Sequence, residues 1–99
     1  MKIVSVGKKL GTVSNTKGRV KEWRENPGND SAACYAAAHY AKRDKENMVV
    51  VPGNSYGSFV LHIAKETEDL WKYAPGTSGE LAVYLAKPSG EVFEAIATR

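Results

Sequence analysis

Residues 29–47 read NDSAACYAAAHYAKRDKEN and carry the strongest helix signal in the chain. Alanine has the highest intrinsic helix propensity, and six alanines fall within this stretch. Asn29 or Asp30 can cap the first turn, and the basic residues near the other end suit the negative C-terminal end of a helix. The stretch therefore predicts one main helix at about 30–45.

One stripe of this helix is made of small side chains, at about 100° per residue: Cys34, Ala37, Ala38 and Ala41. Such a stripe lets a helix lie close to a sheet, where Cys34 acts as a small buried hydrophobe. Cys34 and His39 point about 140° apart around the helix, so they cannot form a nucleophile–base pair. Only His62, on a distant strand, could serve Cys34 as a base. We interpret both Cys34 and His62 as structural residues.

Short apolar runs separated by turn signals predict strands on both sides of the helix. Lys2–Val6 reads as a first strand, and the polar, glycine-punctuated segment Gly7–Gly18 reads as a loop or wide hairpin. After the helix, Met48–Val51 and Ser58–Lys65 read as two strands joined by a turn at Pro52–Gly57.

The C-terminal part predicts a second hairpin, because residues 80–87 and 91–98 flank Pro88-Ser89-Gly90. Before it, Thr67 can cap a short helix near 68–73 that ends ahead of Pro75. The expected fold is α+β, with a mostly antiparallel sheet of about five to six strands and the main helix packed on one face. Residues 1–99 are expected to form a single domain.

The segment Gly18–Glu25 fits two structures. As a strand it places Arg19, Lys21 and Trp23 on one face. As a helix it pairs Val20 with Trp23. The glycines that flank this short segment favour the strand.

The composition is that of an ordinary globular protein, with 42% hydrophobic and 25% charged residues. The single cysteine cannot form an internal disulfide, which fits a reducing compartment. The apolar stretch Ile3–Val6 is too short for a signal peptide, and no run approaches the roughly 18 apolar residues of a spanning helix. We therefore expect a cytoplasmic protein with no membrane partner.

No motif in the sequence points to catalysis or to a cofactor. The cysteine and the two histidines show no zinc-ligand spacing, and the glycines form neither a dinucleotide-binding nor a phosphate-binding loop. We expect a non-enzymatic protein with no catalytic, cofactor-binding or metal-binding site.

The positive charge is concentrated in the N-terminal quarter. Residues 1–28 carry seven basic and two acidic side chains, whereas residues 29–99 carry seven basic and nine acidic ones. On a strand, cations beside an indole can follow a phosphate backbone while the ring stacks on a base. Nucleic-acid binding is therefore the alternative function, with these candidate residues: Lys8, Lys9, Lys17, Arg19, Lys21 and Trp23.

Binding to another protein is the leading hypothesis. The turn residues Asn54, Ser55 and Tyr56 combine a rigid aromatic ring with adaptable polar groups, as interface residues often do. The charged face of Arg19, Lys21 and Trp23 is the other candidate contact surface, and an exposed sheet edge offers a route to a homo-oligomer. The expected role is that of a small inhibitor, adaptor or regulator, with a phage or mobile element as a candidate source.

Overall fold

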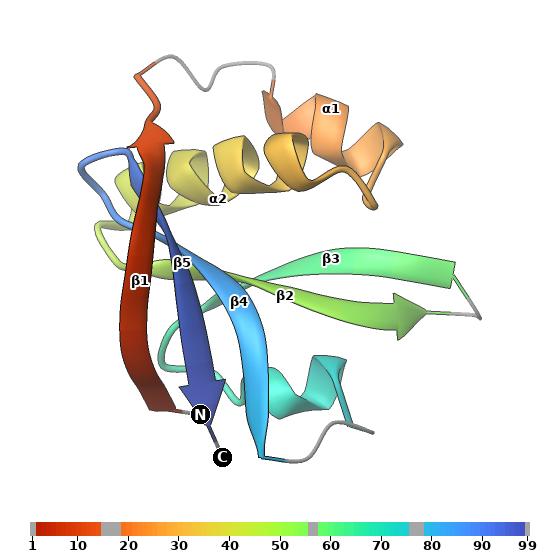
Figure 1. Cartoon of the computed structure of the whole chain (residues 1–99). Coiled ribbons are helices and arrows are strands. Elements are labelled where there is room, and N and C mark those ends of the chain that lie inside the picture. The colour runs from red at the N-terminus through yellow and green to blue at the C-terminus, as the bar shows by residue number, and fades with distance from the viewer. Residues whose placement is uncertain (1, 15–18, 56–57, 76–78, 99) are drawn as a thin grey trace.

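The computed structural model describes residues 2–14, 19–55, 58–75 and 79–98. Within these ranges the chain forms a five-stranded antiparallel sheet with helices on one face and a 3-10 helix on the other (Figure 1). The elements are, in chain order, β1 (Lys2–Thr12), α1 (Arg19–Glu25), α2 (Asp30–Asp44), β2 (Met48–Ser55), β3 (Ser58–Lys65), η1 (Leu70–Tyr73), β4 (Glu80–Ala86) and β5 (Glu91–Thr98). The predicted α+β fold is confirmed.

The sheet has the strand order β1-β5-β4-β2-β3 and separates two apolar clusters. Val49 and Val51 pack toward η1, whereas Met48 and Val50 pack toward the alanine face of α2. Successive residues of a strand point to opposite faces. Both faces are covered at this point, which explains why β2 begins with a continuous apolar run.

Helix α2 confirms the interpretation of the alanine-rich stretch. The Asn29 side chain caps it by accepting the N–H of Ala32 at 2.9 Å. The helix ends at Lys45, which adopts the left-handed conformation (φ 56°) and donates its N–H to the carbonyl of Ala41. The small residues on its inner face are buried against the sheet, and Cys34 is only 8% exposed.

The strand preferred for Gly18–Glu25 is wrong, because Arg19–Glu25 forms helix α1. Val20 and Trp23 are half-buried, and the indole N–H of Trp23 donates to the carbonyl of Leu61 on β3 at 3.1 Å. This tertiary bond, together with packing on α2, outweighs the strand preference suggested by the flanking glycines.

The loop expected to begin at Gly7 is also wrong, because β1 continues to Thr12. The register between β1 and β5 shifts between Ile3 and Ser5, between Val6 and Lys9, and between Lys9 and Gly11. At each shift β1 has one extra residue, so the side chains that follow point to the opposite face of the sheet. The sequence therefore lacks the alternation that identifies a strand.

The turn expected at Pro52–Gly57 is displaced, because β2 runs on to Ser55. β2 pairs with β4 only from Met48 to Val50, and beyond that point it pairs with β3 alone. Pro52 stands opposite Leu61, whose N–H points out of the sheet to the carbonyl of Pro27. The backbone nitrogen of Pro52 therefore points away from β3, toward the side from which β4 has diverged. Because no strand pairs with β2 on that side, the proline removes no hydrogen bond between strands.

The divergence of β2 from β4 opens the sheet, and η1 fills one side of the opening (Figure 1). The side chain of Asp69, in place of the expected Thr67, caps η1 by accepting the N–H of Trp71. Gly53 lies so close to η1 that a Cβ atom there would stand 2.2 Å from the carbonyl oxygen of Tyr73.

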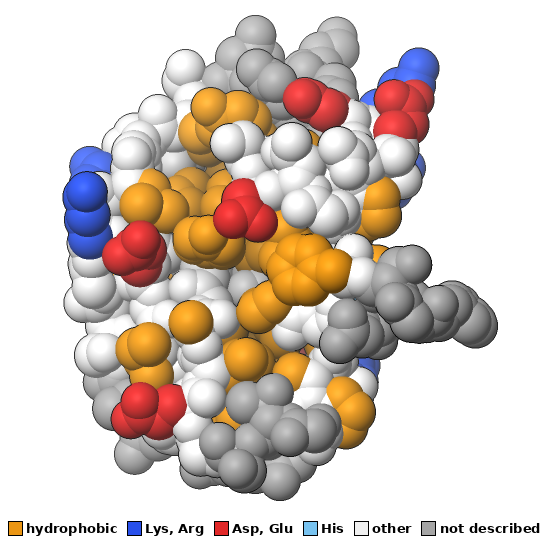
Figure 2. Space-filling model, turned by 45° about the vertical axis from the view of Figure 1, so that its right-hand side comes forward, with side chains coloured by type: hydrophobic (Ala, Val, Ile, Leu, Met, Phe, Trp, Pro, Cys, Tyr) orange, Lys and Arg blue, Asp and Glu red, His pale blue; other side chains and the backbone are white. Residues whose placement is uncertain are grey.

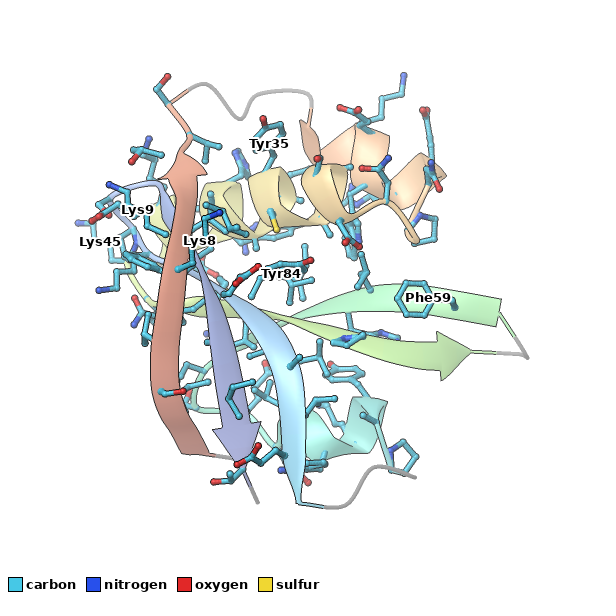
Figure 3. The ribbon with its side chains drawn as sticks, in the orientation of Figure 1. Lys8, Lys9, Tyr35, Lys45, Phe59 and Tyr84 are labelled. Carbon is cyan, nitrogen blue, oxygen red and sulfur yellow. The ribbon has the colours of Figure 1, made fainter. Side chains whose placement is uncertain are left out.

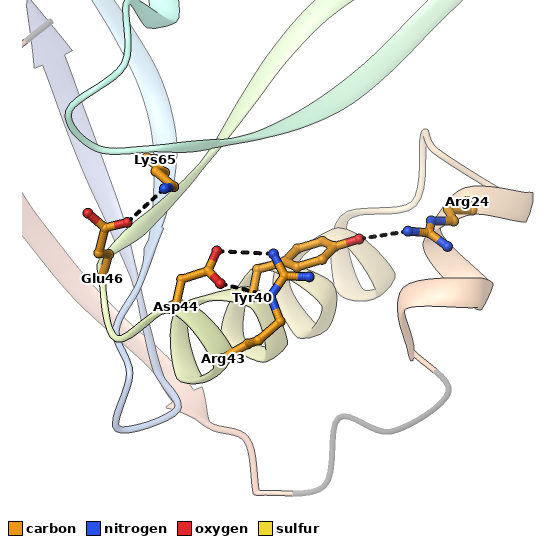
Figure 4. A network of polar contacts seen from close by, with 6 residues as sticks. All are labelled: Arg24, Tyr40, Arg43, Asp44, Glu46 and Lys65. Carbon is orange, nitrogen blue, oxygen red and sulfur yellow. Dashed lines mark hydrogen bonds and ion pairs between the residues drawn. The ribbon is translucent and has the colours of Figure 1, made fainter.

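Polar contacts hold the helices and the α2–β2 connection in place (Figure 4). Arg24 of α1 donates to the hydroxyl of Tyr40 at 3.1 Å, and the guanidinium of Arg43 lies 4.6 Å from the centre of the same ring. Arg43 also pairs with Asp44, and this contact raises the pKa of Arg43 and lowers that of Asp44. These contacts are exposed and add little to stability, and it is the Arg24–Tyr40 bond that joins α1 to α2.

Candidate functional site

An open groove of about 500 Å³ lies on the face of the sheet that α2 covers only in part. Ala86 and Val92 are buried under α2, whereas Ala82 on the same face of β4 is exposed. The diverging β2–β3 hairpin forms the second wall. We call this cavity the sheet groove, and its lining includes Pro52, Phe59, Leu61, Ala82, Tyr84, Glu94, Ile96 and Asp30.

A smaller cavity of about 260 Å³ lies between α2 and the strands β1, β4 and β5. We call it the helix pocket, and its lining includes Leu10, Thr12, Val13, Ser31, Cys34, Tyr35 and Val92. Asp30 and Tyr84 line both cavities. The sheet groove and the helix pocket therefore meet at these two residues, and together we call them the trough.

Asp30 and Tyr84 form a hydrogen bond at this junction. The hydroxyl of Tyr84 donates to Oδ2 of Asp30 at 3.0 Å. Burial raises the pKa of Tyr84 to about 12, and its bond to Asp30 and the nearby negative charges add to the effect. Tyr84 therefore stays neutral at physiological pH. None of the described residues donates to Oδ1 of Asp30, so this oxygen can accept a further donor.

The trough is acidic although the chain as a whole carries a net charge of +3. Asp30 and Glu94 line the sheet groove, and Glu80 points to the same face because it precedes Ala82 by two positions on β4. Within the described residues, neither Asp30 nor Glu94 forms an ion pair. Figure 2 shows acidic side chains around an apolar hollow.

Phe59 stands at the outer wall of the sheet groove, and its side chain is 54% exposed. It projects from β3 on the face that also carries Tyr84 (Figure 3). Leu61, two residues further along the same strand face, is only 2% exposed. A large aromatic ring left open beside an apolar hollow is a feature of binding surfaces.

Cys34 lines the helix pocket but is not poised for nucleophilic chemistry. Burial and the nearby Asp30 raise the pKa of its thiol to about 12, so the thiol stays protonated. His62 lies on the opposite face of the sheet, where its ring stacks on Tyr73 at a centroid distance of 4.5 Å. The interpretation of Cys34 as a buried packing residue is confirmed.

Neither a group of metal-ligand side chains nor a membrane-spanning helix occurs in the described part of the chain. Among these residues, no group of three or more His, Cys, Asp or Glu side chains is placed to hold a metal ion. None of their helices combines the length and apolar character needed to cross a bilayer.

The candidate basic residues whose side chains are described lie on two elements, β1 and α1. Lys8 and Lys9 lie on β1, where Lys9 pairs with Glu91 at 3.2 Å, and Lys21 lies on α1 (Figures 1 and 3). Lys21 is exposed and approaches Glu25 at 3.9 Å. Trp23 is half-buried, with its N–H bonded to Leu61, so it does not project as a stacking platform.

Several candidate residues lie outside the described part of the structure. Lys17 and Tyr56 are not described, and for Arg19, Asn54 and Ser55 the description covers the backbone alone. Their proposed roles in binding stay predictions.

The residues that line the trough were missed because they come from six different elements. One weak signal was present in the second hairpin, whose turn sets Ala82 opposite Ile96 and Tyr84 opposite Glu94. These pairs place two apolar side chains, a tyrosine and an acid on one sheet face. The sequence does not show that α2 leaves part of this face open.

No protein-family model, curated protein or solved structure matches this chain.

Proposed function

We propose that this protein binds a short segment of another protein in the trough, and that it acts by binding and not by catalysis. The observation that carries the proposal is an open apolar groove that ends at a junction of polar groups, Asp30 and Tyr84. Binding sites commonly combine an apolar lining with a few placed polar groups. A cytoplasmic location is part of the proposal and rests on the single cysteine.

The size and charge of the trough indicate what occupies it. A cavity of about 500 Å³ accepts a few side chains and lies within the range of sites for small ligands. The acidic groups at its rim disfavour an anionic occupant and favour one that carries positive charge. A short peptide segment with apolar side chains and a net positive charge meets both conditions.

We expect the partner segment to insert side chains into the trough and not to add a strand to the sheet, because both edges of the sheet are obstructed. At the β3 edge, Leu61 already donates to Pro27 and accepts from Trp23. At the β1 edge, the register shifts and the lysines Lys8 and Lys9 interrupt a regular ladder. Bulges and charged residues are established means of preventing edge-to-edge pairing. The homo-oligomer through a sheet edge stays a prediction without support from these contacts.

A selection from random peptides displayed on phage tests the proposal. Selected peptides are then measured against the wild type, Ala82→Arg and Thr67→Arg. Ala82 is an exposed residue in the sheet groove, so an arginine there occupies the groove and faces its acidic groups without disturbing the core. Thr67 is also exposed but lies in the connection before η1, and it therefore provides a matched control of charge and size.

We expect the selected peptides to bind the wild type and Thr67→Arg equally and to lose at least tenfold in affinity for Ala82→Arg, a loss of about 1.4 kcal/mol. Peptides that bind all three proteins equally would place the binding surface elsewhere. Failure to select any peptide would contradict the proposal.

A further inference from the structure

We propose that the trough has two subsites, and that the partner segment places an apolar side chain in the sheet groove and a lysine or arginine side chain at Asp30, where the helix pocket begins. This inference rests on the proposed function and specifies the chemistry of the partner. The observation behind it is that the apolar and the acidic parts of the trough meet at one pair of residues, Asp30 and Tyr84.

The carboxylates of Asp30 and Glu94 at the junction form no ion pair with a described lysine or arginine. Oδ2 of Asp30 accepts the Tyr84 hydroxyl, while Oδ1 has no hydrogen-bond partner among the described side chains. Glu94 stands directly opposite Tyr84 in the β4–β5 pairing and lines the same groove. An ammonium or guanidinium group near Tyr84 would therefore have two carboxylates nearby, those of Asp30 and Glu94.

The position of Asp30 at the start of α2 does not cancel the preference of the junction for a cation. The N-terminus of a helix carries roughly half a positive charge, which offsets only part of the charge of one carboxylate. Asp30 and Glu94 together leave the junction with a net negative charge. The neutral tyrosine ring adds to the attraction for a cation, because the face of an aromatic ring attracts cations.

The apolar subsite lies beside this junction. Phe59 and Leu61 form one wall, and Ala82 and Ile96 form the floor. A ring or a branched aliphatic side chain here would be within a few bonds of a cation at Asp30. The partner segment therefore carries an apolar residue close to a lysine or arginine.

Three small probes of nearly equal shape separate the two subsites: phenethylammonium, 2-phenylethanol and 3-phenylpropionate, which are cationic, neutral and anionic. Each is titrated into ¹⁵N-labelled full-length protein, and amide chemical shifts give both the site and the affinity. The test variant is Asp30→Asn with Glu94→Gln, which keeps the shape and the acceptor for Tyr84. The control is Glu25→Gln, which removes an exposed carboxylate on α1, away from the trough.

We expect the cation to bind about tenfold more tightly than the alcohol, since one charge-assisted hydrogen bond contributes about that factor. The anion should bind most weakly. In the double variant the cation and the alcohol should bind within about twofold of each other, because the alcohol keeps the apolar subsite. Glu25→Gln should retain the full preference for the cation.

Equal binding of the cation and the alcohol to the wild type would overturn the cation subsite and leave the proposed function intact, since the apolar groove would still be occupied. The absence of shifts at the trough with all three probes would also overturn it. The peptide selection decides separately whether the trough binds a protein segment, so the two failures are distinguishable.

Discussion

Replacement of Gly53 by alanine tests whether η1 lies directly on β2. An added Cβ would stand 2.2 Å from the carbonyl oxygen of Tyr73, and His62 would lie 3.3 Å away. Since the nearest obstacle is backbone, β2 and η1 would have to separate by about an ångström, and overpacking of this kind costs about 1–3 kcal/mol. The lower entropy of alanine in the unfolded chain returns about 0.4–1 kcal/mol.

We therefore expect Gly53→Ala to lower the free energy of unfolding by about 1 kcal/mol after this gain is subtracted, measured by urea titration with tryptophan fluorescence. In a domain of this size the melting temperature should fall by roughly 4–8 °C. Gly11→Ala is the matched control, because no atom lies within 4 Å of a Cβ at that position. A Gly53→Ala protein as stable as the wild type would refute the described contact, as would an equal loss in Gly11→Ala.

Four further measurements, one on the wild type and three on variants, test other parts of the structure. Cys34, with its pKa raised to about 12, should react with a thiol reagent at pH 7.5 only at the rate of unfolding, and rapid labelling would contradict its burial. Leu61→Ala should cost about 2–5 kcal/mol in urea titration, because Leu61 is buried in the apolar cluster between the sheet and α2, and a loss below 1 kcal/mol would be inconsistent with this packing. Trp23→Phe should cost about 1 kcal/mol by the same assay, through loss of the bond to the Leu61 carbonyl, and an unchanged stability would argue against that bond. Burial lowers the pKa of His62, so the unfolded state takes up a proton at a higher pH than the folded state. The free energy of unfolding should therefore fall as the pH drops through the folded pKa. His62→Gln should reduce this loss, as followed by urea titration between pH 7.5 and 5.

The sequence was sufficient for elements with strong local signals. Asn29 and the alanines that follow it specify where α2 starts and which face is buried. The Pro88-Ser89-Gly90 turn fixes the β4–β5 hairpin, and Gly90 there adopts a positive φ of 94°. In both cases the interactions that define the element are close in the sequence, so the pattern predicts them.

The remaining elements depend on contacts between distant residues. Helix α1 is short, and its indole bond to Leu61 spans 38 positions. The irregular register of β1 removes its alternation, and the extension of β2 past Pro52 requires that β4 has already diverged. The trough results from that divergence and from the limited reach of α2, and neither is visible in a local pattern.

The most direct test of the trough as the binding surface is a map of amide chemical shifts in the full-length protein on addition of a selected peptide. We expect the largest changes on residues that line the sheet groove and its junction with the helix pocket, among them Asp30, Phe59, Ala82, Tyr84 and Ile96. Changes concentrated at Lys8 and Lys9 on β1, or on α1 around Lys21, with the trough unaffected, would contradict it.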